Sequence, residues 1–385
     1  MKYRLESFGG IVASEEPPFL AFVDREFMRE LGAGGSPLWR GTDESIGTLS
    51  APTEVHMAVT NRCPLRCRHC YMGAGEPDPA ELDTAGMKRA LAALADMGVF
   101  HVALGGGEAL ARDDLFEIAA HSRELGLVPN LTVSGALMTP GIARRMKVFG
   151  QVNVSMDGVG EAYGVYRDGA GFAAADAALG MLVSAGVPAG INCVVGGTNF
   201  GLIGELFEYA ARAGANEIEF LRLKPAGRGG EDYLRDRTDR RQNLELFPLL
   251  QCFSERHGVT AKVDCSFMPM VCEHRPPVDY LESTGTYGCV AGNVLLGARS
   301  DGSVAGCSFL PPLGLDVFGL AGAWADDPEL ERLRNWPGRA PEPCRSCEYL
   351  EVCRGGCRAV AAFSGDPGDP DPDCPRVVRW REERS

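Results

Sequence analysis

The chain has 385 residues, of which 45% are hydrophobic and 23% charged, so it is long enough for two domains or for one large domain with an appendage. Its formal net charge of −14 argues against nonspecific nucleic-acid binding, because phosphates would be repelled. The sequence has no run of 18 apolar residues and no leader-like start, so we expect a cytoplasmic protein that does not enter a membrane. In a reducing compartment the fourteen cysteines, most of them clustered, indicate metal ligands rather than disulfides.

The first 52 residues form an N-terminal extension that precedes the cysteine motifs. Two short apolar runs, 8–13 and 19–23, predict strands, and residues 25–31 predict a helix that ends at Gly32. We expect this strand and helix extension to pack on the domain that follows.

From residue 53 the chain alternates between strands and helices. Apolar runs predict six strands, at 55–59, 99–104, 128–133, 151–156, 188–195 and 217–223. Amphipathic segments predict helices between them, the first with Thr84 as its N-cap. This alternation is typical of an α/β fold with a parallel sheet, in which ligands gather at the C-terminal ends of the strands. After the last strand, the mixed charges of residues 231–243 predict a solvated connector.

The loop after the first of these strands carries Cys63, Cys67 and Cys70 at CxxxCxxC spacing. Thiolates are soft ligands that suit iron–sulfur clusters, and three of them leave one iron of a [4Fe-4S] cluster without a protein ligand. The alternative is a zinc knuckle or three buried cysteines. His69 is a poor fourth zinc ligand, because a residue wedged between two ligands rarely reaches the same metal.

Polar residues follow two further strands. Gly105-Gly106-Gly107-Glu108 combines glycines, which let the backbone approach a ligand, with a carboxylate that can accept from an ammonium group. The fourth strand ends near Ser155, with Arg167 shortly after it, and a guanidinium suits a carboxylate. Taken singly, these features are equally compatible with an ordinary glycine turn and a solvated arginine.

The last hundred residues contain a second array of seven cysteines. Cys289 is followed by twelve residues, a glycine, four residues and Cys307. The remaining five follow a C-x2-C-x5-C-x3-C-x16-C pattern, at Cys344, Cys347, Cys353, Cys357 and Cys374. A zinc ribbon is the alternative for residues 344–357 alone.

The first triplet, the Gly-Gly-Glu turn and the seven-cysteine array together resemble the radical SAM superfamily with a C-terminal SPASM domain. The resemblance covers residues 53–380. It implies a partial (β/α)6 TIM-type barrel at 53–230, a bridging region at 231–284 and a small loop-rich iron–sulfur domain at 285–385. Residues 1–52 also resemble the PqqD-like peptide-recognition module, although the segment is shorter than that module.

In this family the first cluster binds S-adenosylmethionine (SAM) through its open iron. The resemblance implies that the amino group, carboxylate and ribose of SAM contact Gly106, Gly107, Glu108, Ser155, Arg167 and Ser134. The family usually has proline after the glutamate, whereas this chain has Ala109.

The resemblance also implies two auxiliary [4Fe-4S] clusters, for a total of three. One would be held by Cys344, Cys347, Cys353 and Cys374. The other would be held by Cys289, Cys307 and Cys357, with an upstream fourth ligand. We expect Cys272 as that ligand, with Cys265 as the second choice. If neither cysteine reaches the cluster, one of its irons would be open. Asp373 is a minor alternative, as an oxygen ligand.

The implied activity is that of a peptide-modifying radical SAM oxidoreductase. Such an enzyme generates a 5′-deoxyadenosyl radical, abstracts hydrogen, and oxidatively modifies or crosslinks a ribosomally made peptide. The implied partners are a small precursor peptide and an electron donor such as flavodoxin or ferredoxin. Two alternatives stay open, a tetrapyrrole (haem-type) side-chain modification and a non-catalytic iron–sulfur electron carrier. The pattern singles out no catalytic acid or base.

Overall fold

A computed structural model describes residues 1–16, 18–41, 46–167 and 171–384. Its centre is a ten-stranded sheet in the order β10-β9-β8-β7-β6-β5-β4-β11-β12-β13. The six predicted strands are β4 (Glu54–Thr60), β5 (His101–Gly106), β6 (Val128–Val133), β7 (Val152–Ser155), β8 (Ala189–Val195) and β9 (Glu217–Arg222). They lie side by side in chain order and are all parallel, so the predicted α/β partial barrel is confirmed.

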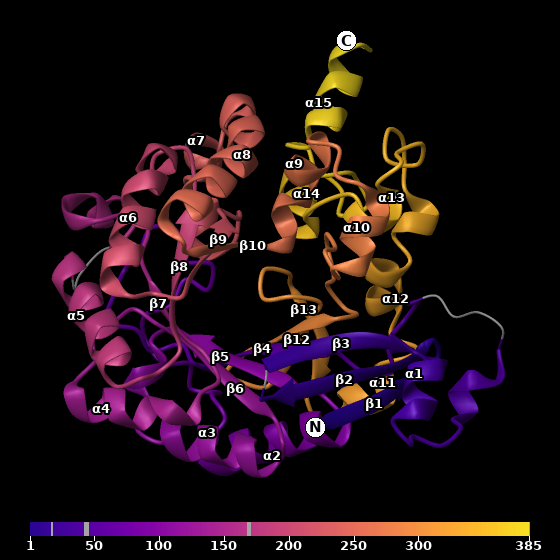
Figure 1. Cartoon of the computed structure of the whole chain (residues 1–385), viewed down its shortest axis with the longest axis horizontal. Coiled ribbons are helices and arrows are strands. Elements are labelled where there is room, and N and C mark those ends of the chain that lie inside the picture. Colours follow the sequence, from indigo (N-terminus) through magenta and orange to yellow (C-terminus); the bar gives the residue numbers. More distant parts are fainter. Residues whose placement is uncertain (17, 42–45, 168–170, 385) are drawn as a thin grey trace.

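Helices form the outer layer of this curved sheet (Figure 1). They are α2 (Thr84–Asp96), α3 (Leu115–Glu124), α4 (Pro140–Arg145), α5 (Gly171–Ser184) and α6 (Ile203–Ala213). Their apolar residues recur every three or four positions, as in α2, where Met87, Leu91 and Leu94 are buried against the sheet. The predicted N-cap of α2 was wrong by one residue: Asp83 accepts from the Gly86 amide, whereas the Thr84 hydroxyl donates to Asp114.

Strands from the C-terminal part extend the sheet at both ends. β10 (Thr260–Val263) pairs in parallel with β9, and β11 (Leu295–Ala298) pairs in parallel with β4. β12 (Ser303–Ala305) and β13 (Pro312–Asp316) continue from β11 as antiparallel strands. One sheet therefore runs through the segments expected to be barrel, bridging region and iron–sulfur domain.

The N-terminal extension is a separate antiparallel sheet, and it packs on the barrel as expected. It contains β1 (Lys2–Glu6), β2 (Gly9–Glu15) and β3 (Pro18–Asp24), followed by α1 (Arg25–Glu30). β1 was not predicted. Phe8 and Ile11 share an apolar cluster with Phe100 of the barrel, and Arg4 Nη1 donates to the Gly98 carbonyl at 3.0 Å.

The C-terminal third is rich in loops and short helices, and it faces the open side of the sheet (Figure 1). After β9 come α7 (Tyr233–Asp236) and α8 (Arg240–His257), and α8 packs on α6 of the barrel. The helices of the C-terminal third are α9 (Met268–Glu273), α10 (Val278–Ser283), α11 (Leu320–Ala323), α12 (Pro328–Arg334), α13 (Leu350–Cys353), α14 (Arg358–Ser364) and α15 (Pro375–Glu382). The prediction of a solvated connector at 231–243 was wrong at α7, because Tyr233 and Asp236 are buried. Within the described ranges, no helix combines the length and hydrophobicity needed to cross a bilayer.

Candidate functional site

The loop after β4 carries the first three cysteines, and it is anchored from two sides. The Cys63 amide donates to the Gly75 carbonyl at 2.8 Å. From the loop after β9, Arg228 Nε donates to the Cys67 carbonyl at 3.0 Å, and the Arg228 amide donates to the Cys70 carbonyl at 3.0 Å. No disulfide joins any of the fourteen cysteines, all of which lie in the described ranges. Disulfide formation therefore does not compete with metal ligation here.

A glycine presses the β9 loop against the cysteine loop. Gly227 has a φ of +54°, and a Cβ there would lie 2.5 Å from the Cys70 carbonyl oxygen and 2.4 Å from that of Tyr71. Only glycine tolerates both the left-handed backbone and this close approach. The close packing fixes the cysteine loop at the end of the barrel.

The three thiols lie near one another and near Glu108. Burial raises the pKa of Cys63, and the Glu108 carboxylate and the thiols of Cys67 and Cys70 raise it further. Among the described residues, no group of three His, Cys, Asp or Glu side chains is arranged around a single metal ion. Three neighbouring thiols are a soft donor set that suits the irons of a four-iron cluster.

The Gly-Gly-Glu turn docks directly beside the cysteine loop. The Gly107 amide donates to the Thr60 carbonyl and the Glu108 amide to the Arg62 carbonyl, both at 2.8 Å. A Cβ on Gly107 would lie 2.3 Å from the Arg62 carbonyl oxygen, so a larger residue would push the two loops apart. This packing brings Glu108 to the edge of the cysteine loop.

Glu108 is buried, and its carboxylate is already oriented by hydrogen bonds. It accepts from the Ser134 amide at 2.9 Å, from the Ser134 hydroxyl, and from the Leu110 amide at 3.2 Å. Burial raises the pKa of Glu108, and these hydrogen bonds oppose that effect. The structure thus brings together the residues expected near the amino group and near the ribose of SAM.

Asp157 connects the cysteine loop to the expected carboxylate-binding residue. Its Oδ2 lies 2.7 Å from Arg167 Nε and 3.1 Å from His69 Nε2, while its Oδ1 accepts from the Val194 amide at 2.7 Å. Burial alone would raise the pKa of Asp157, but Arg167 and His69 lower it to about 2. An ionised Asp157 therefore holds Arg167 and the cysteine loop at a fixed distance from each other.

Sequence reasoning identified Ser155 and Arg167 but missed Asp157, which pairs with Arg167. Ser155 is half-buried at the end of β7, two residues before Asp157. The signals were a carboxylate just past a strand end and a histidine between two cysteines. The side chain of His69 is only 7% exposed, and its ring centre lies 5.3 Å from that of Tyr166.

Further along the chain, four thiols form what we call the first auxiliary group. Its members are Cys265, Cys289, Cys307 and Cys357. Burial raises the pKa of Cys265, and the nearby Cys289 and Cys357 raise it further. Burial also raises the pKa of Cys307, and Cys289 and Cys357 raise it further. Cys265 is therefore close to Cys289 and Cys357, two of the three cysteines that the sequence grouped together.

The second auxiliary group surrounds a cavity of about 110 Å³. Its members are Cys344, Cys347, Cys353 and Cys374, as the sequence pattern grouped them. Cys272 also lines this cavity, and a hydrogen bond with Cys272, together with burial, raises the pKa of Cys353. The structure therefore places Cys272 with the second group and Cys265 with the first, which reverses the expected order of preference.

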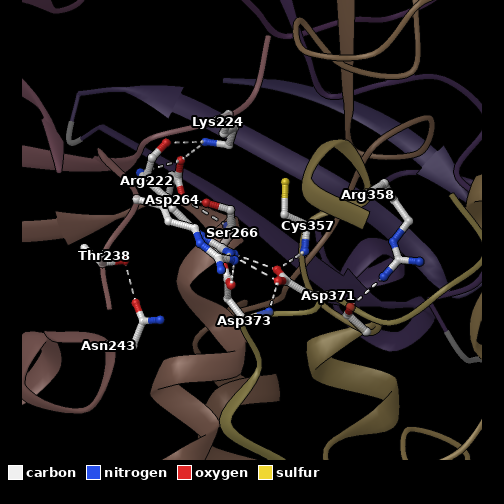
Figure 2. A network of polar contacts seen from close by, with 12 residues as sticks. Arg222, Lys224, Thr238, Asn243, Asp264, Ser266, Cys357, Arg358, Asp371 and Asp373 are labelled. Atoms are coloured by element: carbon white, nitrogen blue, oxygen red, sulfur yellow. Dashed lines mark hydrogen bonds and ion pairs between the residues drawn. The ribbon is translucent and has the colours of Figure 1, made fainter. Parts of the chain in front are cut away.

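A buried polar network joins β9 to the C-terminal loops (Figure 2). The Arg222 guanidinium donates to both oxygens of Asp371, at 2.6 and 3.1 Å, and to Asp373 at 2.8 Å. The Cys357 amide donates to Asp371 Oδ2 at 3.0 Å. Both aspartates therefore pair with Arg222 at the end of β9. Asp373, the minor alternative ligand, is thus bound to arginine.

An aromatic contact joins the first cysteine loop to the first auxiliary group. Tyr71 follows Cys70, Phe309 lies two residues after Cys307, and their ring centres are 4.8 Å apart. Burial raises the pKa of Tyr71 to about 12, and both of these cysteines contribute in the same direction. The two thiol sites therefore approach each other across this ring pair.

Comparisons with known proteins agree with this geometry. The family model described as the radical SAM superfamily matches residues 57–210. Mycofactocin maturase MftC of Mycobacterium ulcerans is 31% identical, over 85% of this chain and 88% of its own length. AdoMet-dependent heme synthase of Methanosarcina barkeri is 30% identical (86% and 98%), and PqqA peptide cyclase of Ruegeria pomeroyi is 28% identical (86% and 88%).

Solved structures show the same fold. Streptococcus suis SuiB bound to its precursor peptide SuiA superposes with a TM-score of 0.75, over 97% of this chain and 98% of SuiB. The protein anSMEcpe with bound AdoMet and a peptide superposes with a TM-score of 0.63, over 86% of this chain and 96% of anSMEcpe. Both are 18% identical to this chain, so they support the architecture.

Proposed function

Because this chain belongs to the radical SAM superfamily, we propose that this radical SAM enzyme oxidatively modifies or crosslinks a ribosomally made precursor peptide. The observation that carries the proposal is the 31% identity to a maturase over 85% of this chain and 88% of the maturase's own length. The buried carboxylates and cysteines described above would serve SAM and the clusters, respectively.

Cys63, Cys67 and Cys70 would hold the first [4Fe-4S] cluster and leave one iron open for SAM. With SAM bound and the cluster reduced, this site supplies a 5′-deoxyadenosyl radical that can abstract hydrogen from a substrate. Glu108, with Gly106 and Gly107 beside it, would accept hydrogen bonds from the ammonium group of SAM.

Ser134 fixes the orientation of Glu108 by donating to it, and Ser155 and Arg167 would bind the carboxylate of SAM. Asp157 orients Arg167 through Nε, so the rest of its planar fork can face a ligand. These residues would thus be oriented in advance to bind the amino group and the carboxylate of SAM.

The two auxiliary groups would each hold a further [4Fe-4S] cluster, which makes three in total. We assign Cys265 as the fourth ligand beside Cys289, Cys307 and Cys357, because it is the upstream cysteine that interacts with Cys289 and Cys357. Cys272 is a fifth thiol at the second group and donates or accepts a hydrogen bond with Cys353. These buried thiols require a reducing compartment, so we place the enzyme in the cytoplasm, with flavodoxin or ferredoxin as electron donor.

A second candidate function is tetrapyrrole side-chain chemistry, favoured by the 30% identity to a heme synthase. One experiment separates the candidates. The anaerobically reconstituted protein is incubated with dithionite, SAM and either short peptides encoded beside its gene or porphyrins. We expect 5′-deoxyadenosine and a mass decrease in a peptide only. A mass change in the porphyrin would favour the second candidate, and the absence of 5′-deoxyadenosine would leave only an electron carrier.

A further inference from the structure

A lysine is buried beside the first auxiliary group without being a ligand of it. Lys224 follows β9, and its side chain is only 5% exposed. A buried ammonium is costly unless it is paired. Its Nζ is in an ion pair with Asp264 Oδ2 and lies 3.4 Å from the Arg222 carbonyl oxygen. Figure 2 shows this pair above the Arg222–Asp371 network.

Both members of the Lys224–Asp264 pair lie close to the first auxiliary group. Asp264 directly precedes Cys265 and caps the turn that carries this cysteine, because its Oδ1 accepts from the Ser266 amide at 3.0 Å. Lys224 Nζ lies 4.4 Å from the ring centre of Phe309, two residues after Cys307. The two charges are therefore held at fixed places around the thiols.

The ammonium of Lys224 acts on several thiols of this group. Burial raises the pKa values of Cys265, Cys307 and Cys357, and in each case Lys224 opposes that effect. The second nearby cation, Arg222, is already neutralised by two carboxylates. Among the described residues, Lys224 forms an ion pair with one carboxylate, that of Asp264. Removal of the ammonium therefore leaves that carboxylate uncompensated beside the thiols.

We propose that Lys224 and Asp264 set the reduction potential of the iron–sulfur cluster bound by the first auxiliary group, with Lys224 as a positioning residue that favours the reduced form. This inference rests on the proposed function, which places a cluster there. Reduction adds one electron, taken from the electron donor, so the site becomes more negative. A nearby fixed ammonium stabilises that added charge, and a nearby carboxylate opposes it.

The two charges make opposite predictions. Lys224→Met leaves Asp264 uncompensated and should lower the potential, whereas Asp264→Asn leaves Lys224 uncompensated and should raise it. A unit charge about 10 Å away, at an effective dielectric of about 20, changes the ratio of oxidised to reduced cluster by roughly tenfold. A tenfold change corresponds to a shift of about 59 mV for one electron. The double variant should return to within about twofold of the native ratio, because it removes a neutral pair.

The test is an anaerobic redox titration of the full-length, iron-loaded protein, followed by electron paramagnetic resonance. Lys262→Met is the matched control, since Lys262 pairs with Glu217 on the neighbouring strand but is 56% exposed. We expect opposite shifts for Lys224→Met and Asp264→Asn, and none for the control.

Shifts in the same direction, or no shift with iron intact, would overturn the proposal. If Lys224→Met loses iron, the sign of the potential shift in Asp264→Asn decides the test. Loss of iron in both variants would overturn the proposal, because the pair would then have a purely structural role. A native protein with only about four irons would instead refute the auxiliary clusters of the proposed function before any variant is compared.

Discussion

Asp371 joins the C-terminal loops to Arg222 of the barrel, and Asp371→Asn should loosen that link. The side chains of Asp371 and Arg222 are 0% and 3% exposed, so both charges are removed from water. Losing one partner of a buried pair costs about 3–5 kcal/mol, because the other charge is left without compensation. Asp373 still contacts Arg222, so we expect the lower end of this range, about 3 kcal/mol.

The assay is hydrogen exchange followed by mass spectrometry, on peptides that contain Cys357. The Cys357 amide donates to Asp371, so its exchange reports local opening of this link. A loss of about 3 kcal/mol corresponds to exchange that is roughly 100-fold faster. Asp369→Asn is the control, because Asp369 is exposed in the same loop, whereas the Arg222 guanidinium donates to the carboxylates of Asp371 and Asp373. Equal exchange in the two variants would refute the reasoning.

Three further predictions concern the first site. Gly107→Ala should weaken SAM binding at least tenfold by calorimetry, because the added Cβ would lie 2.3 Å from a backbone oxygen. Gly105→Ala is the control and should bind SAM normally, because a Cβ there would meet no atom within 4 Å. Cys67→Ala should abolish formation of 5′-deoxyadenosine yet keep about eight irons. The pKa of Asp157 in the folded protein is lowered to about 2, from an ordinary value of 3.8. The ionised carboxylate therefore stabilises the fold by about 2 kcal/mol above pH 3.8, and this contribution is lost as the pH falls towards 2. Acid unfolding followed by circular dichroism should show this loss in the native protein but not in Asp157→Asn.

Each of these predictions has a contradicting outcome. Equal SAM affinity in the two glycine variants would show that the turn does not shape the SAM site. Product formation by Cys67→Ala would remove the cluster assignment. An identical acid transition in Asp157→Asn would mean that Asp157 is not ionised in the folded protein at low pH.

The sequence predicted the parallel sheet well, because each strand is an apolar run bounded by an amphipathic helix. It also predicted which loops meet, since the C-terminal ends of parallel strands lie along one edge. Glu108 and Ser134, which are 26 positions apart, meet there as this rule requires. The return of β11 to pair with β4 could not be predicted, because a four-residue strand has little pattern of its own.

The choice between Cys265 and Cys272 could not be read from spacing. The two cysteines are seven positions apart and flank the turn into α9, so local packing alone decides which group each one faces. Asp157 was missed for a similar reason: its partners, His69 and Arg167, come from two different loops, and nothing in the local sequence marks them as neighbours.

The central claim is that this chain holds three [4Fe-4S] clusters at three separate sets of thiols. The most direct test is the iron, sulfide and zinc content of anaerobically purified protein, with Mössbauer spectra to identify the cluster type. We predict about twelve irons and twelve sulfides for each chain. About four irons, or zinc in place of iron, would contradict the account.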